Sequence, residues 1–147
     1  MKIIKYINDN FISINPMIKM KDIAKLFFES NQHIIIVEED QKYLGVINVD
    51  SIFLALLPPS LDLIDNFAFI KDFGALENEF LDQSKINLFL AEDLMNTQYP
   101  TLNPHDSILK AVVLLHYKKL RAIPVIENDK VLGIITRNTI CKIIANQ

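Results

Sequence analysis

The sequence predicts an α/β (α+β) fold built from two tandem β-α-β-β-α repeats with a helical insert between them. Three observations predict it. A shift of 88 residues lays Phe11–Leu57 over Tyr99–Ala145 without a gap. Each of these segments holds two short runs rich in isoleucine and valine around a polar turn, the pattern of a β-hairpin. The chain has 147 residues, 50% hydrophobic and 22% charged, which is typical of a globular protein.

A shared motif keeps the two repeats in one register. Ser13-Ile14-Asn15-Pro16 aligns with Thr101-Leu102-Asn103-Pro104. A unit of this size is too small to bury both faces of its own sheet, so the two copies are expected to pack together. We therefore divide the chain into a first repeat (1–57), an insert (58–92) and a second repeat (93–147).

Each repeat begins with a short extended piece, Phe11–Ile14 or Thr101-Leu102, that ends at an Asn-Pro pair, because the residue before proline avoids the helical region. A helix follows, and Asp106 is its expected N-cap in the second repeat. Its apolar residues recur at i, i+3, i+4 and i+7, as on a buried helix face. They are Met20, Ile23, Ala24 and Phe27 in the first repeat, and Ile108, Ala111, Val112 and Leu115 in the second.

Two apolar runs around a polar turn come next in each repeat and predict a β-hairpin. The runs are short enough to be strands. The predicted strands and turns are Ile34–Val37, Glu38–Lys42 and Tyr43–Ile47 in the first repeat, and Ile123–Ile126, Glu127–Lys130 and Val131–Ile135 in the second.

A second helix closes each repeat. In the second repeat, Ile140, Ile143 and Ile144 are spaced for one buried face. Thr136 or Asn138 is expected to cap this helix, because both side chains can accept a hydrogen bond from a free backbone N–H group.

The insert is long for a connection, so we expect it to have structure of its own. Gly74 is expected to divide it into two helical pieces, or into a loop and a helix. Leu76, Phe80 and Leu81 then share a face that packs on its own domain or on a second copy; docking to a different protein is the alternative. The large apolar residues of the insert are Leu61, Ile64, Phe67, Phe69, Ile70, Phe73, Leu76, Phe80, Leu81, Ile86, Leu88, Phe89 and Leu90.

Composition and spacing exclude several classes of function. A net charge of −3 and a pI of 5.6 argue against nucleic acid and anionic membranes as partners. One cysteine and three separated histidines offer no disulfide, CxxC pair or metal site, and three scattered glycines offer no phosphate-binding loop. We therefore expect neither a metal nor enzymatic activity. With no signal-peptide core and no apolar run of about 20 residues, we expect a cytoplasmic protein.

Three motifs of the second repeat, Asn103–Ile108, Ala122–Ile126 and Val131–Thr136, resemble a cystathionine-β-synthase (CBS) domain. The first repeat resembles it less closely, with Ile36 where the family usually has proline. Two such repeats in tandem resemble a Bateman module, and the resemblance covers about two-thirds of the chain. It implies a disc with pseudo-two-fold symmetry, a homodimer, and regulation of a protein partner in trans without catalysis. The implied ligands are ATP, ADP, AMP or S-adenosylmethionine, bound in clefts between the repeats.

The resemblance also implies where a ligand binds. In the family, a Gly-h-x-Ser/Thr-x-x-Asp stretch places a hydroxyl on phosphate and a carboxylate on the ribose. Here the stretch after Gly133 keeps Thr136 but has Thr139 at the carboxylate position, and the first repeat has Asn48 and Ser51. Losing hydrogen bonds to a charged acceptor costs roughly 1.5–3 kcal/mol, or about 10- to 100-fold in affinity. We expect the site of the second repeat to bind and that of the first to be empty.

A stretch that leads into a helix N-terminus favours binding of an anion, because the helix offers free N–H groups and the positive end of its dipole. The alternative for Thr136 is a plain helix cap, and Asp50 is expected to be an N-cap before a ribose contact. Arg137, Lys118-Lys119 and Arg121 can supply charge to phosphate, with a solvated helix end and loop as the alternative. The expected ligand-binding residues are Tyr99, Thr101, Ile123, Pro124, Thr136, Arg137 and Thr139, and those of a weaker second site are Ser13, Ile35, Asn48 and Ser51.

Two functions therefore remain open for the chain. The first is a sensor that binds an adenine nucleotide or adenosyl compound between the repeats. The second is an interaction or dimerisation scaffold whose nucleotide sites have degenerated, as the missing carboxylates suggest.

Overall fold

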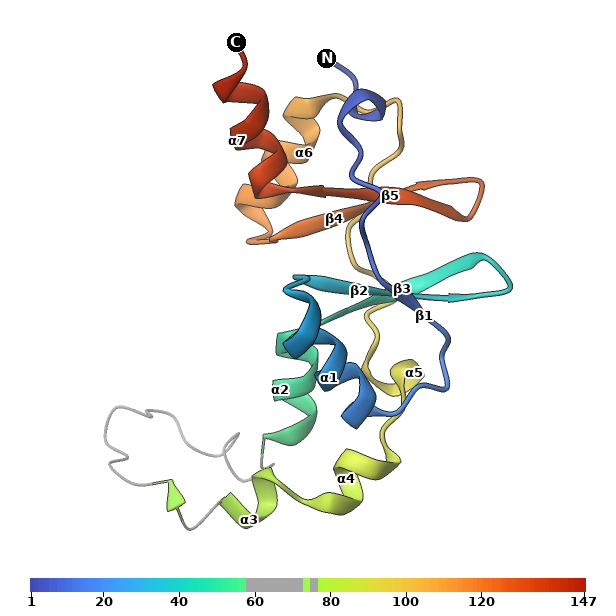
Figure 1. Cartoon of the computed structure of the whole chain (residues 1–147), viewed down its shortest axis with the longest axis vertical. Helices are drawn as coiled ribbons and strands as arrows, with labels where there is room; N and C mark the ends of the chain where they lie inside the picture. Colours follow the sequence, from blue (N-terminus) through green and yellow to red (C-terminus); the bar gives the residue numbers. More distant parts are fainter. Residues whose placement is uncertain (58–72, 75–76) are drawn as a thin grey trace.

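The computed structural model describes residues 1–57, 73–74 and 77–147. It has two similar halves that are stacked on each other through their sheets (Figure 1). Helices α1 (Met20–Ser30) and α2 (Val49–Leu56) cover the outer face of one sheet. Helices α6 (Ile108–Tyr117) and α7 (Arg137–Ala145) cover the outer face of the other. The mixed α and β architecture with two repeats confirms the predicted fold class.

The first half is built around a three-stranded sheet. Strand β1 (Ser13–Ile14) pairs parallel with β2 (Ile34–Glu39), which pairs antiparallel with β3 (Lys42–Asn48). Helix α1 spans Met20–Ser30, and helix α2 spans Val49–Leu56.

The second half repeats this order. Strands β4 (Ala122–Glu127) and β5 (Lys130–Thr136) form the hairpin, between helices α6 (Ile108–Tyr117) and α7 (Arg137–Ala145). Leu102 forms a single parallel bridge with Val125 at the place of β1. The secondary-structure order predicted for each repeat is therefore present in both.

Both hairpins are longer than predicted because their turns are tighter. The two central residues of each turn, Asp40-Gln41 and Asn128-Asp129, have φ between 51° and 65°. Two successive residues of positive φ make a turn whose twist matches that of the flanking strands. The charged residues that we assigned to the turns, such as Glu39 and Lys42, therefore pair with each other in the ladder.

Between the two sheets lies a buried cluster that both halves share. It consists of Ile34, Ile36, Val46, Tyr99, Ala122 and Ile134. Pairs of these residues are related by the shift of 88, such as Ile34 with Ala122 and Val46 with Ile134. The repeats thus bury the inner faces of their sheets against each other, which is the physical reason for two copies.

The segment that precedes each half packs on the other half. Ile3, in the 3-10 helix η1 (Ile3–Tyr6), is buried in the core of the second half. Ala91, in helix α5 (Ala91–Leu94), is buried in the core of the first half. Ile3 and Ala91 are themselves 88 residues apart, so the repeat extends further towards the N-terminus than the alignment that we used. Packing therefore crosses the boundaries between the sequence repeats.

The end of the insert covers the bottom of the first half (Figure 1). Helices α3 (Glu77–Phe80) and α4 (Gln83–Leu88) are short, and Phe80, Ile86 and Phe89 pack against the first core. Leu81, predicted to share the face of Phe80, is 57% exposed. Of the remaining predicted apolar residues, Phe73 and Leu88 are exposed and Leu90 is half-buried. Six more lie outside the described residues: Leu61, Ile64, Phe67, Phe69, Ile70 and Leu76. No helix in the described ranges is long and apolar enough to cross a membrane.

Two of the predicted helix faces need correction. In α1, Ala24 is exposed, and Leu26 packs beside Phe27 instead, because the helix is rotated to bury Met20 and Ile23. In α7, Ile144 is 67% exposed, whereas Ile140 and Ile143 pack inwards as predicted. An apolar stripe at i, i+3 and i+4 is wider than the face that each of these short helices buries. One residue of the predicted stripe therefore remains exposed in each helix.

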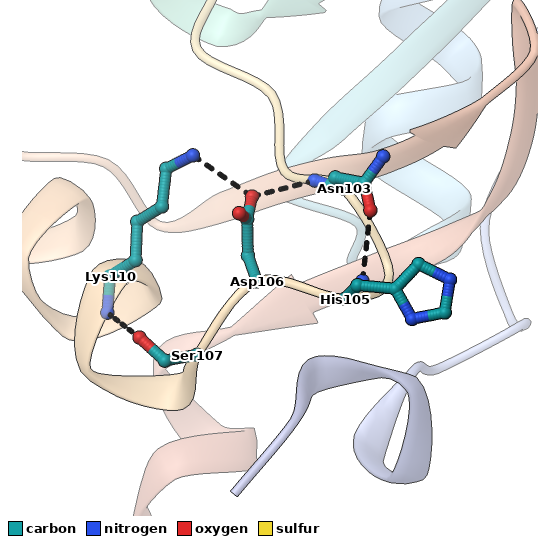
Figure 2. A network of polar contacts seen from close by, with 5 residues as sticks. All are labelled: Asn103, His105, Asp106, Ser107 and Lys110. Atoms are coloured by element: carbon teal, nitrogen blue, oxygen red, sulfur yellow. Dashed lines mark hydrogen bonds and ion pairs between the residues drawn. The ribbon is translucent and has the colours of Figure 1, made fainter.

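The N-cap of α6 is Ser107 and not Asp106. Ser107 Oγ accepts the backbone N–H of Lys110 at 3.2 Å (Figure 2). Asp106 instead accepts the backbone N–H of Asn103 at 2.8 Å and the Nζ of Lys110 at 2.9 Å. The backbone hydrogen bond from Asn103 lowers the pKa of Asp106 most, and the Lys110 hydrogen bond and charge lower it further. Asp106 thus fixes the turn in front of the helix, one residue before the cap.

Candidate functional site

Two clefts lie on either side of the loops around residues 31–33 and 119–121, where the halves meet. The Asn48 cleft has a volume of about 530 Å³, and the Thr136 cleft one of about 620 Å³. Asn48–Asp50 line the first cleft, and their counterparts Thr136–Asn138 line the second. The residues that both clefts share are Asn31, Gln32, His33, Lys119 and Arg121. The clefts are therefore related by the same pseudo-symmetry as the repeats, with a common wall.

A third hollow, the outer groove, adjoins the Thr136 cleft. It has a volume of about 580 Å³ and lies between residues 5–9 and helix α7. Asn8, Thr136 and Asn138 line both the groove and the Thr136 cleft, so the two form neighbouring lobes of one depression. Lys5 and Lys142 line the groove and not the Thr136 cleft.

The first turn of α7 is closed by a reciprocal pair of hydrogen bonds. Thr136 Oγ1 accepts the backbone N–H of Thr139, and Thr139 Oγ1 accepts that of Thr136, both at 3.2 Å. The two hydroxyl oxygens lie 3.1 Å apart, so one proton lies between them. Each hydroxyl has a single proton to donate. One of the two threonine hydroxyls therefore keeps a proton that it can donate to a ligand.

Helix α2 begins in the same way with different side chains. Asn48 Oδ1 accepts the backbone N–H and the hydroxyl of Ser51 at 2.9 and 3.1 Å. Ser51 Oγ accepts the backbone N–H of Asn48 at 3.4 Å. Asn48 is thus the N-cap, and Asp50 lies in the first helical turn, contrary to our prediction. The amide NH₂ of Asn48 remains as a donor towards its cleft.

The wall shared by the clefts carries positive charge. Lys119 and Arg121 line both clefts, together with His33. Within the part of the chain that the structure describes, neither cation forms an ion pair. An unpaired lysine and arginine at the mouth of a cleft attract anions, and arginine suits the geometry of phosphate.

Arg137 lies in the Thr136 cleft but is already engaged with the protein. Its Nε donates to the carbonyl oxygen of Leu120, and its Nη2 to that of Leu115, both at 2.7 Å. The guanidinium therefore binds both the last turn of helix α6 and the segment that follows it. It is not the freely solvated side chain that the alternative interpretation described.

Tyr99 lies on the Asn48 cleft, whereas we had grouped it with Thr136. It is 7% exposed, and its hydroxyl donates to the carbonyl oxygen of Ala122 at 2.7 Å. Burial raises the pKa of Tyr99 to about 12, with a smaller contribution from Tyr43. The hydroxyl is thus a neutral donor that ties the start of the second repeat to strand β4.

The other predicted ligand residues lie away from the described clefts. Ile35 and Ile123 are fully buried in the two outer cores, and Pro124 is buried in β4. Ser13 and Thr101 are exposed, and neither lines a cleft described above. Thr139 lines the outer groove. The structure therefore brings Thr136 and Arg137 together, with Thr139 next to them.

Sequence reasoning missed the loop residues Asn31 and His33, and also Asn8. A signal was present, because Asn31 and His33 align with Lys119 and Arg121 under the shift of 88. In the first repeat, Asn31 and His33 thus occupy the positions that the two cations occupy in the second. Asn8 aligns with an identical residue, Asn96, just outside the segment that we compared.

A family model described as the CBS domain matches residues 3–58 and 91–146, which together make up most of the chain. The chain belongs to the CBS-domain family. The two matches confirm the tandem pair that we inferred from the repeat. The two matches begin at residues 3 and 91 and therefore include the segments that pack on the opposite repeat.

Solved structures of other proteins share the fold. The conserved protein GK1048 from Geobacillus kaustophilus is 19% identical, with a TM-score of 0.78 over 100% of this chain and 98% of that one. CBSX2, solved in complex with AMP, is 23% identical, with a TM-score of 0.71 over 99% and 97%. The CBS pair of MJ0100, solved with 5′-methylthioadenosine and S-adenosyl-L-methionine, is 16% identical, with a TM-score of 0.69 over 99% and 97%. A search of curated proteins finds no match.

Proposed function

We propose that this CBS pair is a non-catalytic sensor that binds an adenine nucleotide or adenosyl compound in the Thr136 cleft. The candidate ligands are ATP, ADP, AMP and S-adenosylmethionine. The observation that carries the proposal is the combination of the α7 N-terminus, where Thr136 or Thr139 keeps a free hydroxyl proton, with the unpaired Lys119 and Arg121 of the Thr136 cleft. Hydroxyl, helix dipole and cations all favour a phosphate there. The relatives solved with AMP or adenosyl compounds support this ligand class.

The signal would be a population shift. Both halves contribute to the walls of the Thr136 cleft, Asn31–His33 from one and Thr136–Asn138 from the other. A ligand that contacts both halves favours the relative orientation in which it makes most contacts. We propose that a protein partner in trans, in the cytoplasm, recognises this orientation.

The test is a thermal-shift series with the four ligands at millimolar concentration. A ligand at a hundred times its dissociation constant adds about 2.7 kcal/mol, which is a shift of several degrees. Thr136→Ala should abolish the shift. Because this change also removes a helix cap worth about 1 kcal/mol, each shift is measured from the ligand-free midpoint of the same variant.

Asn48→Ala is the matched control, since it removes the equivalent cap of the other repeat. It should retain the ligand-induced shift. If Asn48→Ala abolishes the shift and Thr136→Ala does not, the ligand occupies the other cleft. If none of the four ligands moves the midpoint, the sensor proposal fails.

A scaffold function is the second candidate, and one observation favours it. The side-chain oxygens of both helix starts already accept hydrogen bonds within their own capping boxes, and neither Thr139 nor Ser51 supplies a carboxylate. We propose a homodimer in either case, because large apolar side chains are exposed on the outer helices. They include Phe28, Leu54, Leu109 and Tyr117. Sedimentation velocity should give twice the chain mass of 16.9 kDa, and a monomer at all concentrations would exclude this dimer.

A further inference from the structure

Arg137 makes contacts that its counterpart in the first repeat cannot make. The counterpart is Val49, the first residue of α2. Besides the two bonds from its guanidinium to Leu115 and Leu120, the backbone N–H of Arg137 donates to the carbonyl oxygen of Arg121 at 3.3 Å. Three donors of one residue thus bind the last turn of α6 and the segment that links α6 to β4.

The segment held in this way is the one that carries the cations of the clefts. Lys119 has a φ of 55°, and its counterpart Asn31 has a φ of 58°. Asparagine adopts this left-handed conformation readily, whereas most other residues avoid it. The loop of the first repeat therefore has a residue suited to its conformation, and the loop of the second repeat does not.

Bonds from Arg137 can offset this unfavourable conformation. The carbonyl oxygen of Leu115 accepts both Arg137 Nη2 and the backbone N–H of Leu120, at 2.7 and 3.0 Å. This oxygen belongs to the last turn of α6, where carbonyl groups lack helical partners and carry partial negative charge. A cationic donor at this place stabilises the helix end and the left-handed turn together.

We propose that Arg137 is a positioning residue, which holds the loop of residues 118–121 so that Lys119 and Arg121 face the clefts. It thereby sets the affinity of the Thr136 cleft for a phosphate-bearing ligand through the loop. This inference rests on the proposed function for its ligand. The position of the loop itself can be tested without any ligand.

The ligand-free test is amide hydrogen exchange of the full chain. Arg137→Ala should accelerate exchange at Lys119 and Leu120, whose N–H groups bond to His116 and Leu115. Arg121→Ala is the matched control, because it removes a cation of the same cleft and leaves the bonds of Arg137 intact. It should leave these amides unchanged. Equal exchange in both variants would overturn the positioning role.

The second test is a double-mutant cycle with ADP as the probe, measured by calorimetry. Arg137→Ala should lower the affinity by about tenfold in the wild-type background, equivalent to the loss of one charged hydrogen bond. In a Lys119→Ala/Arg121→Ala background it should lower the affinity little, because the cations that it positions are gone. Additive losses would make Arg137 a direct phosphate contact and overturn the proposal.

The two tests separate the failure of each proposal. If ADP and the other ligands do not bind the wild-type protein, the proposed function fails, and hydrogen exchange still decides whether Arg137 holds the loop. If ADP binds and the losses are additive, the sensor function stands without the positioning role. Arg137→Lys should rescue loop protection only in part, since an ammonium group lacks the planar fork that reaches two carbonyl oxygens.

Discussion

Asn8 and Asn96 occupy equivalent positions in the two halves, and each pairs through its backbone with the opposite half. Asn8 exchanges both backbone hydrogen bonds with Ile134, at 3.0 and 2.9 Å. Asn96 exchanges the same two bonds with Val46, at 2.8 and 3.2 Å. Ile134 and Val46 are likewise 88 residues apart. The entering segment of each half is therefore an extra piece of strand on the other half's sheet.

Glycine next to these bridges is required by close approach of the chain. A Cβ atom at Gly45 would lie 2.8 Å from the carbonyl oxygen of Asn96, and one at Gly133 would collide with Asn8 and Ile7. We expect Gly45→Ala and Gly133→Ala each to destabilise the protein by roughly 1–3 kcal/mol, as overpacking does in cores. Urea unfolding checks this. Unchanged midpoints would mean that the entering segments move aside at little cost.

The left-handed loops predict opposite effects for a reciprocal exchange of residues. Lys119→Asn should stabilise the protein and Asn31→Lys should destabilise it, each by about 1 kcal/mol, since a left-handed residue other than glycine or asparagine costs roughly 1–2 kcal/mol. Denaturant midpoints measure both. Lys119→Asn should also weaken binding of an anionic ligand while raising stability. A stability change of the same sign in both variants would contradict this account.

Tyr43 and Tyr99 should respond differently to loss of their hydroxyl groups. Tyr99→Phe should cost about 0.5–1.5 kcal/mol at neutral pH, because the bond to Ala122 is lost. Tyr43→Phe should be neutral or stabilising, because the Tyr43 hydroxyl is buried with no hydrogen-bond partner in the described residues. Chemical denaturation of both variants tests the contrast. An equal loss in both would show that the Tyr43 hydroxyl is satisfied in solution.

The same tyrosines predict a loss of stability at alkaline pH. Burial raises the pKa of both Tyr43 and Tyr99 from 10.0 to about 12. Because the folded protein holds these protons more tightly, their contribution is complete below pH 10 and is lost as the pH rises through 12. Unfolding midpoints across this range, with tyrosinate absorbance recorded in parallel, should fall less steeply in the double variant Tyr43→Phe/Tyr99→Phe.

Asp106 predicts the opposite dependence at acid pH. Hydrogen bonds from Asn103 and Lys110 lower the pKa of Asp106 below its usual value of 3.8. Its contribution is therefore present above pH 3.8 and is lost as the pH falls through the lowered value. Asp106→Asn should be slightly less stable than the wild type at pH 7, and the difference should vanish in strong acid. A difference independent of pH would assign the effect to turn geometry alone.

The elements of the fold were predictable because their signals are local. Periodicity in isoleucine and valine marks both hairpins, and Asn-Pro pairs mark the helix starts that follow. The capping residue Thr136 was among the expected candidates for the same reason. Ser107 was missed in favour of Asp106 because both side chains are good caps one residue apart.

Long-range features could not be predicted in this way. Ile3 packs in the core of the second half and Ala91 in the core of the first. Which core accepts each side chain depends on packing between distant segments, and sequence periodicity carries no information about such packing. The assignment of Tyr99 to the Asn48 cleft follows from the same crossing. The contacts of Arg137 with Leu115 and Leu120 could not be predicted from residue types, because Arg137 bonds to their backbone carbonyl groups, which every residue has.

The crossing of the entering segments also determines when the chain can fold during synthesis. Residues 1–8 find their backbone partners at residues 104–108 and at Ile134, near the other end of the sequence. A ribosome must therefore make almost the whole second half before the first residues can settle. Domains usually fold as units in the order of their synthesis. Here residues 1–8 must wait for residues 104–134, so this segment should remain open to chaperones until the second half has been made.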